Sequence, residues 1–417
     1  MDAIEQSPAS QRSMMARCCI VGGGPAGMML GYLLGRAGID TIVLEKHPDF
    51  LRDFRGDTVH PSTMQIMDEL GLLQEFLKRP HQRMSKLGGE FGGVNLRIAD
   101  FTHVKAKCPF IAFMPQWDFL DFIAAAGEKF PSLKILRRTE VVDLTWNGDT
   151  VTGVVARTPD GELHITADLT VGCDGRNSIV RARAGLQIED IGAPIDVLWF
   201  RVGKSAATID PPLLHAESGA LLITIDRGNY WQCAYVIPKG QIEALRARGL
   251  ANFKSRVVSM LPTLAEHIDD VSDWDDVKLL TVTIDRLKEW SLPGLLCIGD
   301  AAHAMSPVGG VGINLAIQDA VATANILAEK LQHGAVSADD LDVVRARRLF
   351  PVKVIQAFQV QIQNRILKPV LQGGELTPPL PLRIINAVPW LQGLMARGIG
   401  FGVRPEHVRS PESPASW

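Results

Sequence analysis

A glycine-rich segment near the start of the chain constrains its fold most strongly. The segment, Gly22-Gly23-Gly24-Pro25-Ala26-Gly27, has the spacing G-x-G-x-x-G. It follows an apolar run at 17–21 that is typical of a buried strand, and it precedes an apolar helical pattern that ends near Gly38. A second strand is predicted over 40–45. Strand, glycine turn, helix and strand make a βαβ unit, so we expect an α/β fold that begins as a Rossmann-type dinucleotide-binding unit.

The three glycines of this spacing have different physical tasks. Gly22 permits a tight turn, Gly24 lets the backbone approach a pyrophosphate, and Gly27 lets helix and strand pack closely. The helix that opens at Pro25 and Ala26 offers amide N–H groups and a partial positive charge to phosphates. The alternative is a glycine-rich turn that binds nothing, and the flanking strand and helix disfavour it.

The residue that ends the second strand favours an unphosphorylated ribose. Glu45 lies 18 residues beyond Gly27, and its carboxylate would accept hydrogen bonds from ribose hydroxyls. An acid here, rather than an arginine, fits the adenosine ribose of FAD or NAD. We place the adjacent Lys46 in the same predicted site.

A second motif, at 173–181, follows another apolar strand. Asp174-Gly175 could orient a ribose or an active-site loop, and Arg181 would bring positive charge near phosphates. Asp-Gly after a strand is usually only a turn, so this motif carries weight only beside the others.

The third motif is the most specific, and it again joins a strand to a helix. It runs Gly-Asp-Ala-Ala-His-Ala-Met-Ser-Pro-Val-Gly-Gly-Val-Gly-Ile-Asn over 299–314 and continues to Asp319. An aspartate after the strand can bind a ribityl hydroxyl, glycines let a flat ring lie against backbone, and the helix start can stabilise negative charge on a reduced flavin. We predict flavin contacts from Asp300, Pro307, Gly310, Gly312, Ile313 and Asn314.

The three motifs resemble those of the class A flavoprotein monooxygenases, the 4-hydroxybenzoate hydroxylase-like family, over residues 17–320. The resemblance implies a Rossmann-type FAD-binding domain of the glutathione reductase and 4-hydroxybenzoate hydroxylase type, an inserted mixed β-sheet substrate domain and C-terminal helices. It implies that the first motif binds the ADP half of FAD, the second serves FAD and NAD(P)H, and the third holds the ribityl chain and flavin.

Further positions fit the resemblance less tightly. Arg55 resembles the family's arginine near the flavin, Gln116 its Arg or Gln at the FAD phosphates, and Val141 a residue beside the adenine. Cys173 departs from the pattern, since a small alanine is commoner there.

The chain is expected to divide into interleaved parts. Strand-like runs with aromatic residues fill 195–285 and suggest a sheet inserted between the cofactor motifs. The expected parts are a disordered tail (1–16), the FAD-binding domain (17–85, 112–190 and 280–345), the substrate domain (86–111 and 191–279) and a C-terminal helical region (346–417).

The family chemistry implied is insertion of one oxygen atom from O2 into an aromatic or quinone-like small molecule. NAD(P)H, bound transiently, would reduce FAD, and O2 would then form a flavin C4a-hydroperoxide. Arg55 and Pro307 would lie at the flavin face, and Tyr235 is a candidate substrate contact. Candidate bases are His60, His215, Tyr230 and Tyr235.

Rival functions remain at this point. A reductase or dehydrogenase of the same fold would bind FAD but not use O2 for chemistry. A flavin-dependent halogenase should carry Trp-x-Trp-x-Ile-Pro, but Cys233 and Tyr235 occupy the tryptophan positions. NADH and NADPH are not distinguished by these residues.

Composition excludes other classes. A formal net charge of -3 gives no basic surplus for nucleic acid, and the six cysteines show no metal-ligand spacing, so no metal is expected. The start lacks an apolar signal segment, and no run of about 20 apolar residues is present, so we expect a cytoplasmic protein without membrane contact. A monomer and a homodimer are both compatible with the sequence. The apolar stretch 382–401 could cap the substrate tunnel, meet a membrane or form a dimer contact.

Overall fold

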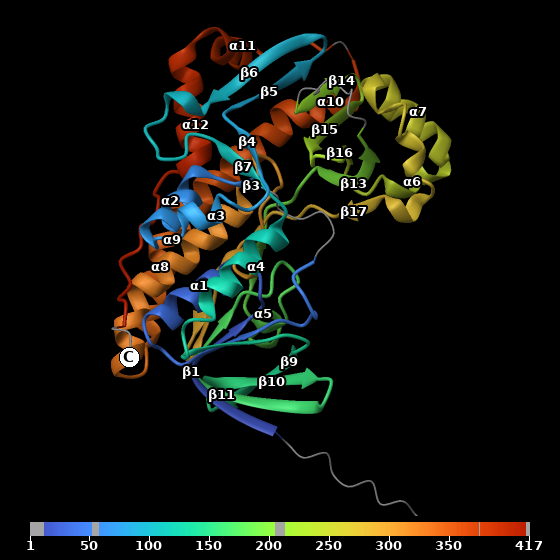
Figure 1. The fold of residues 1–417 in the computed structure, drawn as a ribbon. Helices are drawn as coiled ribbons and strands as arrows, with labels where there is room; N and C mark the ends of the chain where they lie inside the picture. The colour runs from blue at the N-terminus through green and yellow to red at the C-terminus, as the bar shows by residue number, and fades with distance from the viewer. Residues whose placement is uncertain (1–11, 52–57, 205–212, 375, 414–417) are drawn as a thin grey trace, which may run out of the picture.

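In the computed structural model two β-sheets lie end to end, with long helices along one side of the molecule (Figure 1). The structure describes residues 12–51, 58–204, 213–374 and 376–413. The upper sheet combines two strands from residues 86–100 with strands from 195–280, and the lower sheet contains the first strand (Figure 1).

The first sheet has eight strands, of which a parallel core carries the cofactor motifs. Its strands are β19 (Ser291–Leu292), β20 (Leu295–Cys297), β11 (Gly161–Gly172), β1 (Arg12–Val21), β2 (Thr41–Leu44) and β8 (Leu133–Leu136), with β10 (Thr150–Thr158) and β9 (Glu140–Asn147) attached to β11. Neighbours from β20 to β8 run parallel. Strands this deeply buried read as continuous apolar runs, as 17–21 does.

Strand β1 begins earlier than the sequence predicts. Arg12 pairs with Leu163 and Ala16 pairs with Ala167 of β11, so residues 12–16 are a strand and not part of a disordered tail. The apolar pattern misses this half because its exposed positions carry mixed side chains, while the long β11 supplies the backbone partners.

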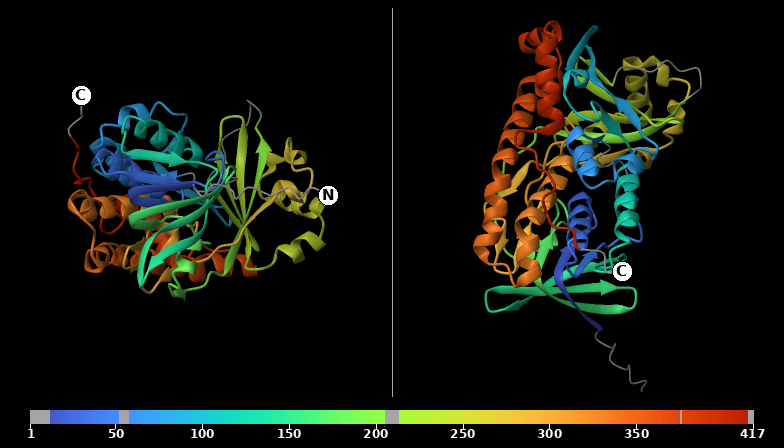
Figure 2. Two further views of the ribbon diagram at one scale, coloured as in Figure 1. Left: turned by 90° about the horizontal axis from the view of Figure 1, so that it is seen from below. Right: turned by 60° about the vertical axis from the view of Figure 1, so that its left-hand side comes forward.

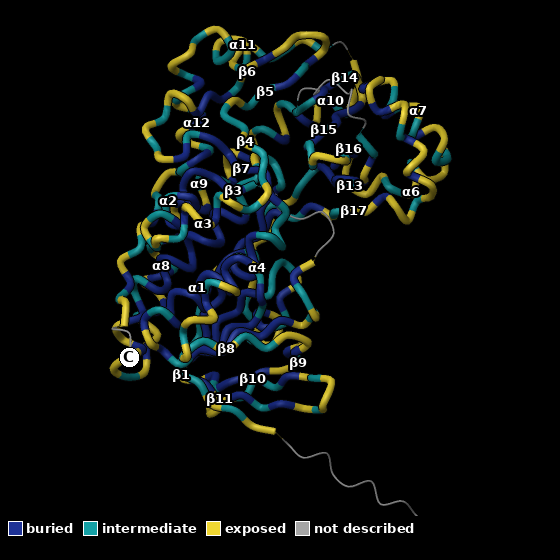
Figure 3. The backbone as a smooth tube through the Cα atoms, viewed as in Figure 1, coloured by how far each residue is buried: buried dark blue, intermediate teal, exposed yellow. Residues whose placement is uncertain are grey.

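Helices cover the first sheet. Helix α1 (Pro25–Arg36) is almost wholly buried between the sheet, α4 (Gln116–Gly127) and α8 (Gly312–His333). Helix α9 (Ala338–Ile362) packs on the outer side of α8. Figure 3 shows the sheet and α1 dark blue, whereas the tips of β9 and β10 are exposed.

The second sheet joins two distant segments. Its strands, in order, are β17 (Lys278–Leu280), β13 (Ile195–Gly203), β16 (Tyr230–Pro238), β15 (Ala220–Asp226), β14 (Leu214–Glu217), β5 (Lys86–Phe91) and β6 (Val94–Asp100). All pairs are antiparallel except β14 with β5. One face is covered by α7 (Leu250–Met260), beside α6 (Ile242–Ala247). These helices lie where the sequence analysis expected strands.

Shorter elements connect and flank the sheets, and the views of Figure 2 show the last helices beside the second sheet. They are β3 (Thr58–Val59), β4 (Gln82–Met84) and β7 (Ile111–Phe113) in a small sheet, the pair β12 (Ile188–Asp190) and β18 (Asp285–Leu287), and the helices α2 (Pro61–Glu69), α3 (Leu73–Phe76), α5 (Ile179–Arg183), α10 (Lys368–Gln372), α11 (Leu380–Ala387) and α12 (Pro389–Phe401). A π-helical turn, Gln363–Leu367, joins α9 to α10.

Candidate cofactor and active site

The three sequence motifs meet at one edge of the first sheet. Val21 of β1 pairs with Gly172 of β11, and Gly172 pairs with Cys297 of β20. These strands are parallel and stop in register, so the residues that follow them lie side by side at the carboxyl edge. In open α/β sheets this edge is where ligands bind.

Two glycines of the first motif are fixed by steric contact. Gly22 has φ 107°, and a Cβ there would lie 2.5 Å from the carbonyl oxygen of Cys173. A Cβ on Gly27 would lie 2.0 Å from the oxygen of Gly22. The tight turn and the close helix–strand approach predicted for these positions are therefore confirmed.

The third motif touches the other two directly. A Cβ on Gly299 would lie 3.1 Å from the Cβ of Ala26 at the start of α1. The Arg176 guanidinium, in the second motif, donates to Asp300 Oδ2 at 3.3 Å. The fold thus brings together three segments, at 22, 173 and 299, that lie far apart in the sequence.

Glu45 ends β2 beside the first glycine turn. It is 6% exposed, and its Oε2 accepts a hydrogen bond from the backbone N–H of Gly23 at 3.1 Å. Its carbonyl oxygen accepts from Thr139 N at 2.9 Å, which brings the segment before Val141 to the same place. Lys46 follows as an exposed residue. Glu45, Lys46 and Val141 remain predicted cofactor residues.

The backbone at this edge leaves room for a dinucleotide. A Cβ on Gly24 would meet only the oxygen of Cys173, at 4.0 Å, and one on Gly312 would meet no atom within 4 Å. Both glycines stand at the start of long helices, where the first N–H groups have no intrahelical acceptor. Pro25 is in the first turn of α1, and Gln116 begins α4, which packs on α1. The site therefore fits FAD.

Two polar residues of the second motif are held by the protein itself. Asp174 Oδ2 accepts from the N–H groups of Ile179 and Val180, at 2.7 and 3.2 Å, and burial raises the pKa of this carboxyl. The Arg181 guanidinium is buried against Asp285 Oδ1 at 3.6 Å and donates to the carbonyl oxygen of Arg176. The following Gly175 has open space around its Cα. Asp174, Gly175 and Arg181 remain predictions as cofactor residues.

Asn314 ties the third motif to the start of α2. Its Oδ1 accepts from His60 N at 2.9 Å and from Thr63 Oγ1 at 2.8 Å, and its Nδ2 donates to the carbonyl oxygens of Thr58 and Gly310. The Asn314 side chain is thus bonded within the protein, and Gly310, Gly312, Ile313 and Asn314 remain predicted flavin contacts. Pro307 begins the turn, since its oxygen accepts from Gly310 N at 3.0 Å.

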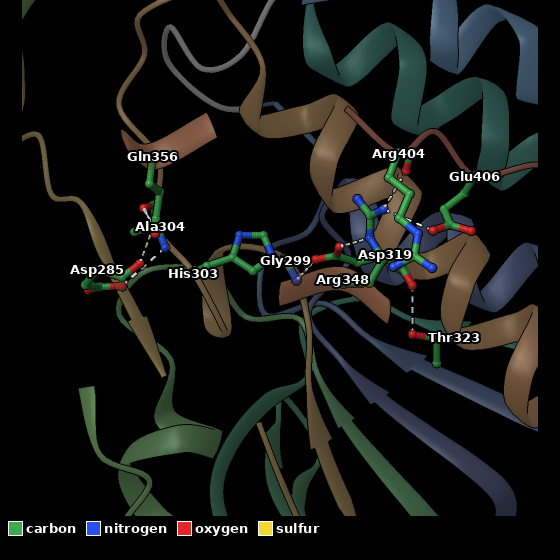
Figure 4. A network of polar contacts seen from close by, with 10 residues as sticks. All are labelled: Asp285, Gly299, His303, Ala304, Asp319, Thr323, Arg348, Gln356, Arg404 and Glu406. Carbon is green, nitrogen blue, oxygen red and sulfur yellow. Dashed lines mark hydrogen bonds and ion pairs between the residues drawn. The ribbon is translucent and has the colours of Figure 1, made fainter. Parts of the chain in front are cut away.

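A buried ionic network supports this edge from behind (Figure 4). Asp319 Oδ2 accepts from Gly299 N at 3.0 Å and lies 2.5 Å from His303 Nε2. Its Oδ1 accepts from Arg348 Nε at 2.8 Å, and Arg348 Nη1 donates to Glu406 Oε1 at 3.1 Å. The network thus links the turn before Asp300 to α8, α9 and the C-terminal segment.

Charge balance explains why the network tolerates burial. Asp319 and Arg348 are 0% exposed. Burial by itself would raise the pKa of Asp319, but His303 and Arg348 hold it below its usual value. The sequence pattern marked Asp319 only as the end of a motif. Arg348 and Glu406 were not predicted, because no spacing rule pairs residues 29 or 58 positions apart.

The two faces of the second sheet contact different neighbours. Tyr235, Cys233 and Trp231 of β16 pack with Phe253 of α7, away from the cofactor motifs. The alternate residues Ala234 and Val236 lie in the cluster on the other face. Strand alternation places Tyr235 on the α7 side, and its role as a substrate contact stays a prediction. Tyr235 lines a cavity of about 370 Å³ with Arg248 and Arg256.

The flavin motif adjoins the other face of this sheet. Val308, between Pro307 and the glycines, packs against the cluster that contains Ala234 and Val236. Trp199 and Ile223 are partly buried there and also contact the cluster around Phe113. Alternation along β13 and β16 was the signal that could have found these positions.

Of the candidate bases, His60 is bonded to the cofactor edge. Its Nδ1 lies 2.9 Å from the carbonyl oxygen of Ile399, and burial lowers its pKa to about 4. His215 is opposite Leu222, whose side chain packs on the α7 face. Tyr230 lies at the start of β16 under the Arg201 guanidinium. Arg55 lies outside the described residues.

Other site types were sought in the described part of the chain. No group of three or more His, Cys, Asp or Glu side chains there could hold a metal ion. No helix in that part has the length and apolar character needed to cross a bilayer. The six cysteines are buried and unpaired, and burial raises the pKa of thiols such as Cys173.

A family model described as an FAD binding domain matches residues 15–357. The chain is 31% identical to a 6-methylpretetramide 4-monooxygenase of Streptomyces rimosus, and the 395 matched residues cover 94% of each protein. It is 26% identical to a para-nitrophenol 4-monooxygenase of Pseudomonas sp. (strain WBC-3), over 76% of this chain and 78% of the relative.

Solved structures share the fold. The OxyS anhydrotetracycline hydroxylase of Streptomyces rimosus superposes with a TM-score of 0.72 at 22% identity, over 96% of this chain and 79% of that one. The arrangement of the two sheets in this chain is thus found in solved structures.

Proposed function

The chain belongs to the FAD-binding domain family and is an FAD-dependent monooxygenase, and from this premise we propose that it hydroxylates a polycyclic phenol with O2 and NAD(P)H. The observation that carries the proposal is the contact of Val308, in the flavin motif, with the inner face of the second sheet. The near full-length similarity to a 6-methylpretetramide 4-monooxygenase suggests the substrate class.

The carboxyl edge of the first sheet would hold the cofactor. The N–H groups at the start of α1 and the space at Gly24 would receive the pyrophosphate, and Glu45 would bind the adenosine ribose. Asp300 would bind the ribityl chain, and the start of α8 would stabilise negative charge on the ring. Bound FAD would supply O2 activation after reduction by NAD(P)H.

The inner face of the second sheet would hold the substrate. Trp199, Ile223 and Val308 are partly buried apolar residues that pack against one cluster, and the buried Ala234 belongs to that cluster. A flat aromatic ring can stack on an indole and be shielded from water there, which the chemistry requires. Trp199 would orient the substrate, and Ala234 would leave room for a ring.

His60 is the base candidate that the proposal retains. Its Nδ1 faces the carbonyl oxygen of Ile399, so the proton resides on Nδ1 and Nε2 is an acceptor. Because burial lowers its pKa to about 4, the ring stays neutral at pH 7. Its Nε2 would accept a hydrogen bond from a phenol hydroxyl, while the imidazole itself stays neutral.

The rival function is an FAD-dependent reductase of the same fold. It is disfavoured because the relatives over most of the chain are named as monooxygenases and a hydroxylase. The test is turnover of the FAD-loaded protein with NADH or NADPH, 18O2 and a tetracyclic phenol. We expect substrate-stimulated NAD(P)H oxidation and one 18O atom in the product. A reduced product formed without O2 would contradict the proposal.

A further inference from the structure

Helix α9 carries an apolar stripe on its outer face. Val343, Phe350 and Phe358 are 51%, 55% and 45% exposed, although the opposite face of the helix holds the buried Arg348. Intervals of three or four residues connect one row of the helix: Val343, Ala346, Phe350, Val354, Ala357 and Gln361. The outer face of a solvent-exposed helix is normally polar, so this apolar row around the exposed Phe350, with the exposed Phe358 at its edge, indicates a contact surface.

Opposite charges flank the stripe. Asp339 lies in the first turn of α9, and Arg365 lies one turn beyond Gln361, in the π-helical turn. Neither side chain has an ion-pair partner within 12–51, 58–204, 213–374 and 376–413. Both stand 13 residues from Val352, so the row is acidic at one end and basic at the other, with the two charges equally far from its middle.

We propose that this stripe is the interface with a second copy of the chain, whose α9 docks antiparallel across a two-fold axis near residue 352. The axis places Asp339 opposite the partner's Arg365, and it repeats this ion pair at the other end. It also places Phe350 opposite the partner's Val354 and the small Ala346 opposite the partner's Phe358. A self-complementary patch of this kind is what two-fold dimers require.

A groove beside the stripe fits one of these contacts. It has a volume of about 150 Å³ and lies between α8, α9 and the C-terminal segment, with Val343, Arg347, Ile326 and Arg409 in its wall. At about 3.6 residues per turn, Arg347 and Phe358 lie on the same edge of α9. A two-fold axis perpendicular to the helix keeps that edge on the same side, so the partner's Phe358 reaches the groove, where arginines can contact its ring.

The proposed interface leaves the cofactor edge free. The inner side of α9 packs on α8 and contacts β19, and its Gln359 bonds the backbone of Ser306 and Val308. Gln359 lies nine residues beyond Phe350, on the opposite face of the helix, so the stripe faces away from the cofactor motifs. In the right-hand view of Figure 2, α9 runs along the outer side of the molecule. From Val343 to Gln361 the row spans about 27 Å at 1.5 Å per residue. Both active sites of the dimer would remain open to substrate.

The first test is sedimentation of the FAD-loaded full chain over a range of concentrations. We expect a dimer, and we expect Phe350→Glu to raise its dissociation constant at least about 100-fold, since a central aromatic anchor is lost. Leu394→Glu, at a 58% exposed site on α12, is the matched control and should leave the constant unchanged. FAD content and circular dichroism verify folding. A monomeric wild type, or dissociation by Leu394→Glu and not by Phe350→Glu, would overturn the proposal.

The second test addresses the antiparallel arrangement. Asp339→Arg and Arg365→Asp should each weaken the dimer about fivefold, because each puts like charges opposite one another at both ends. The double variant should restore the wild-type constant, since the pairs are re-formed with exchanged signs. Single variants without effect, or a double variant weaker than either single one, would contradict this arrangement.

Discussion

The carboxyl edge of the first sheet and the inner face of the second sheet build their sites in different ways. The edge consists of backbone from three motifs, each a contiguous stretch of sequence. At Gly22 and Gly27 the neighbouring backbone leaves no room for a side chain. The inner face consists of alternate side chains from separate strands, such as Trp199 and Ala234. Cofactor binding should therefore depend on backbone geometry at a few positions, and substrate choice on side-chain volume at many.

The edge should depend most strongly on the charges behind it. Arg348→Met would leave Asp319 and Glu406 buried without their counter-ion, so we expect the free energy of unfolding to fall by about 3–5 kcal/mol. Urea denaturation measures this. Arg246→Met, at a 41% exposed side chain on α6, should change stability by less than about 0.5 kcal/mol. Equal effects of the two substitutions would show that the network does not support the edge.

His60 lies at the cofactor edge, where it connects the third motif to α12. Its folded-state pKa of about 4 lies below the ordinary value of 6.5, so the unfolded chain binds the extra proton between these values. Stability should therefore fall as pH drops from 6.5 to 4, by up to about 3 kcal/mol, and be unaffected by this residue above that window. His60→Gln should flatten the slope in urea denaturation at several pH values. If the slope of stability against pH were unchanged, a group other than His60 would be responsible for it.

Gly24→Val separates cofactor binding from folding at the edge. A Cβ at Gly24 would meet no protein atom closer than 4.0 Å, so we expect the protein to fold, whereas the pyrophosphate would be displaced. We expect the dissociation constant for FAD to rise about 100-fold in titration calorimetry. Gly334→Val, at an extended glycine with no neighbour within 4 Å, should bind FAD normally. A Gly24→Val protein that purifies fully yellow would refute the pyrophosphate assignment.

Two adjacent residues of β16, Ala234 and Tyr235, allow the two faces of the second sheet to be compared. Ala234→Leu adds volume on the inner face, so kcat/KM should fall about 10-fold while FAD binding is unchanged. Tyr235→Phe acts on the α7 face and should leave kcat/KM within about twofold. Steady-state assays compare them. The reverse outcome would mean that the substrate binds on the α7 side.

The strand, turn and helix of each motif could be predicted because the residues within a motif are contiguous, whereas the cofactor contacts themselves stay predictions. A glycine turn, a terminal acid and a following helix occur within 17–45, and each has a local signature. The α7 side of Tyr235 could not be predicted, because a strand pattern does not say which neighbour each face meets. Helix α7 had a usable signal, since Phe253, Val257 and Met260 recur at helical intervals, but the aromatic strands around it dominated the prediction.

Long-range partners were beyond such rules. Arg348 and Glu406 contact each other from distant segments, and the early start of β1 depends on β11 as its partner. Sequence patterns report local periodicity, whereas these features depend on which elements fold against each other.

The central claim is that the protein activates O2 at a flavin held by the carboxyl edge. The most direct measurement is rapid mixing of the anaerobically reduced holoprotein with O2, followed by absorbance. We expect a distinct absorbance phase before oxidised flavin returns, and a hydroxylated product when an aromatic substrate is present. A single slow return to oxidised flavin, unchanged by any aromatic substrate, would contradict it.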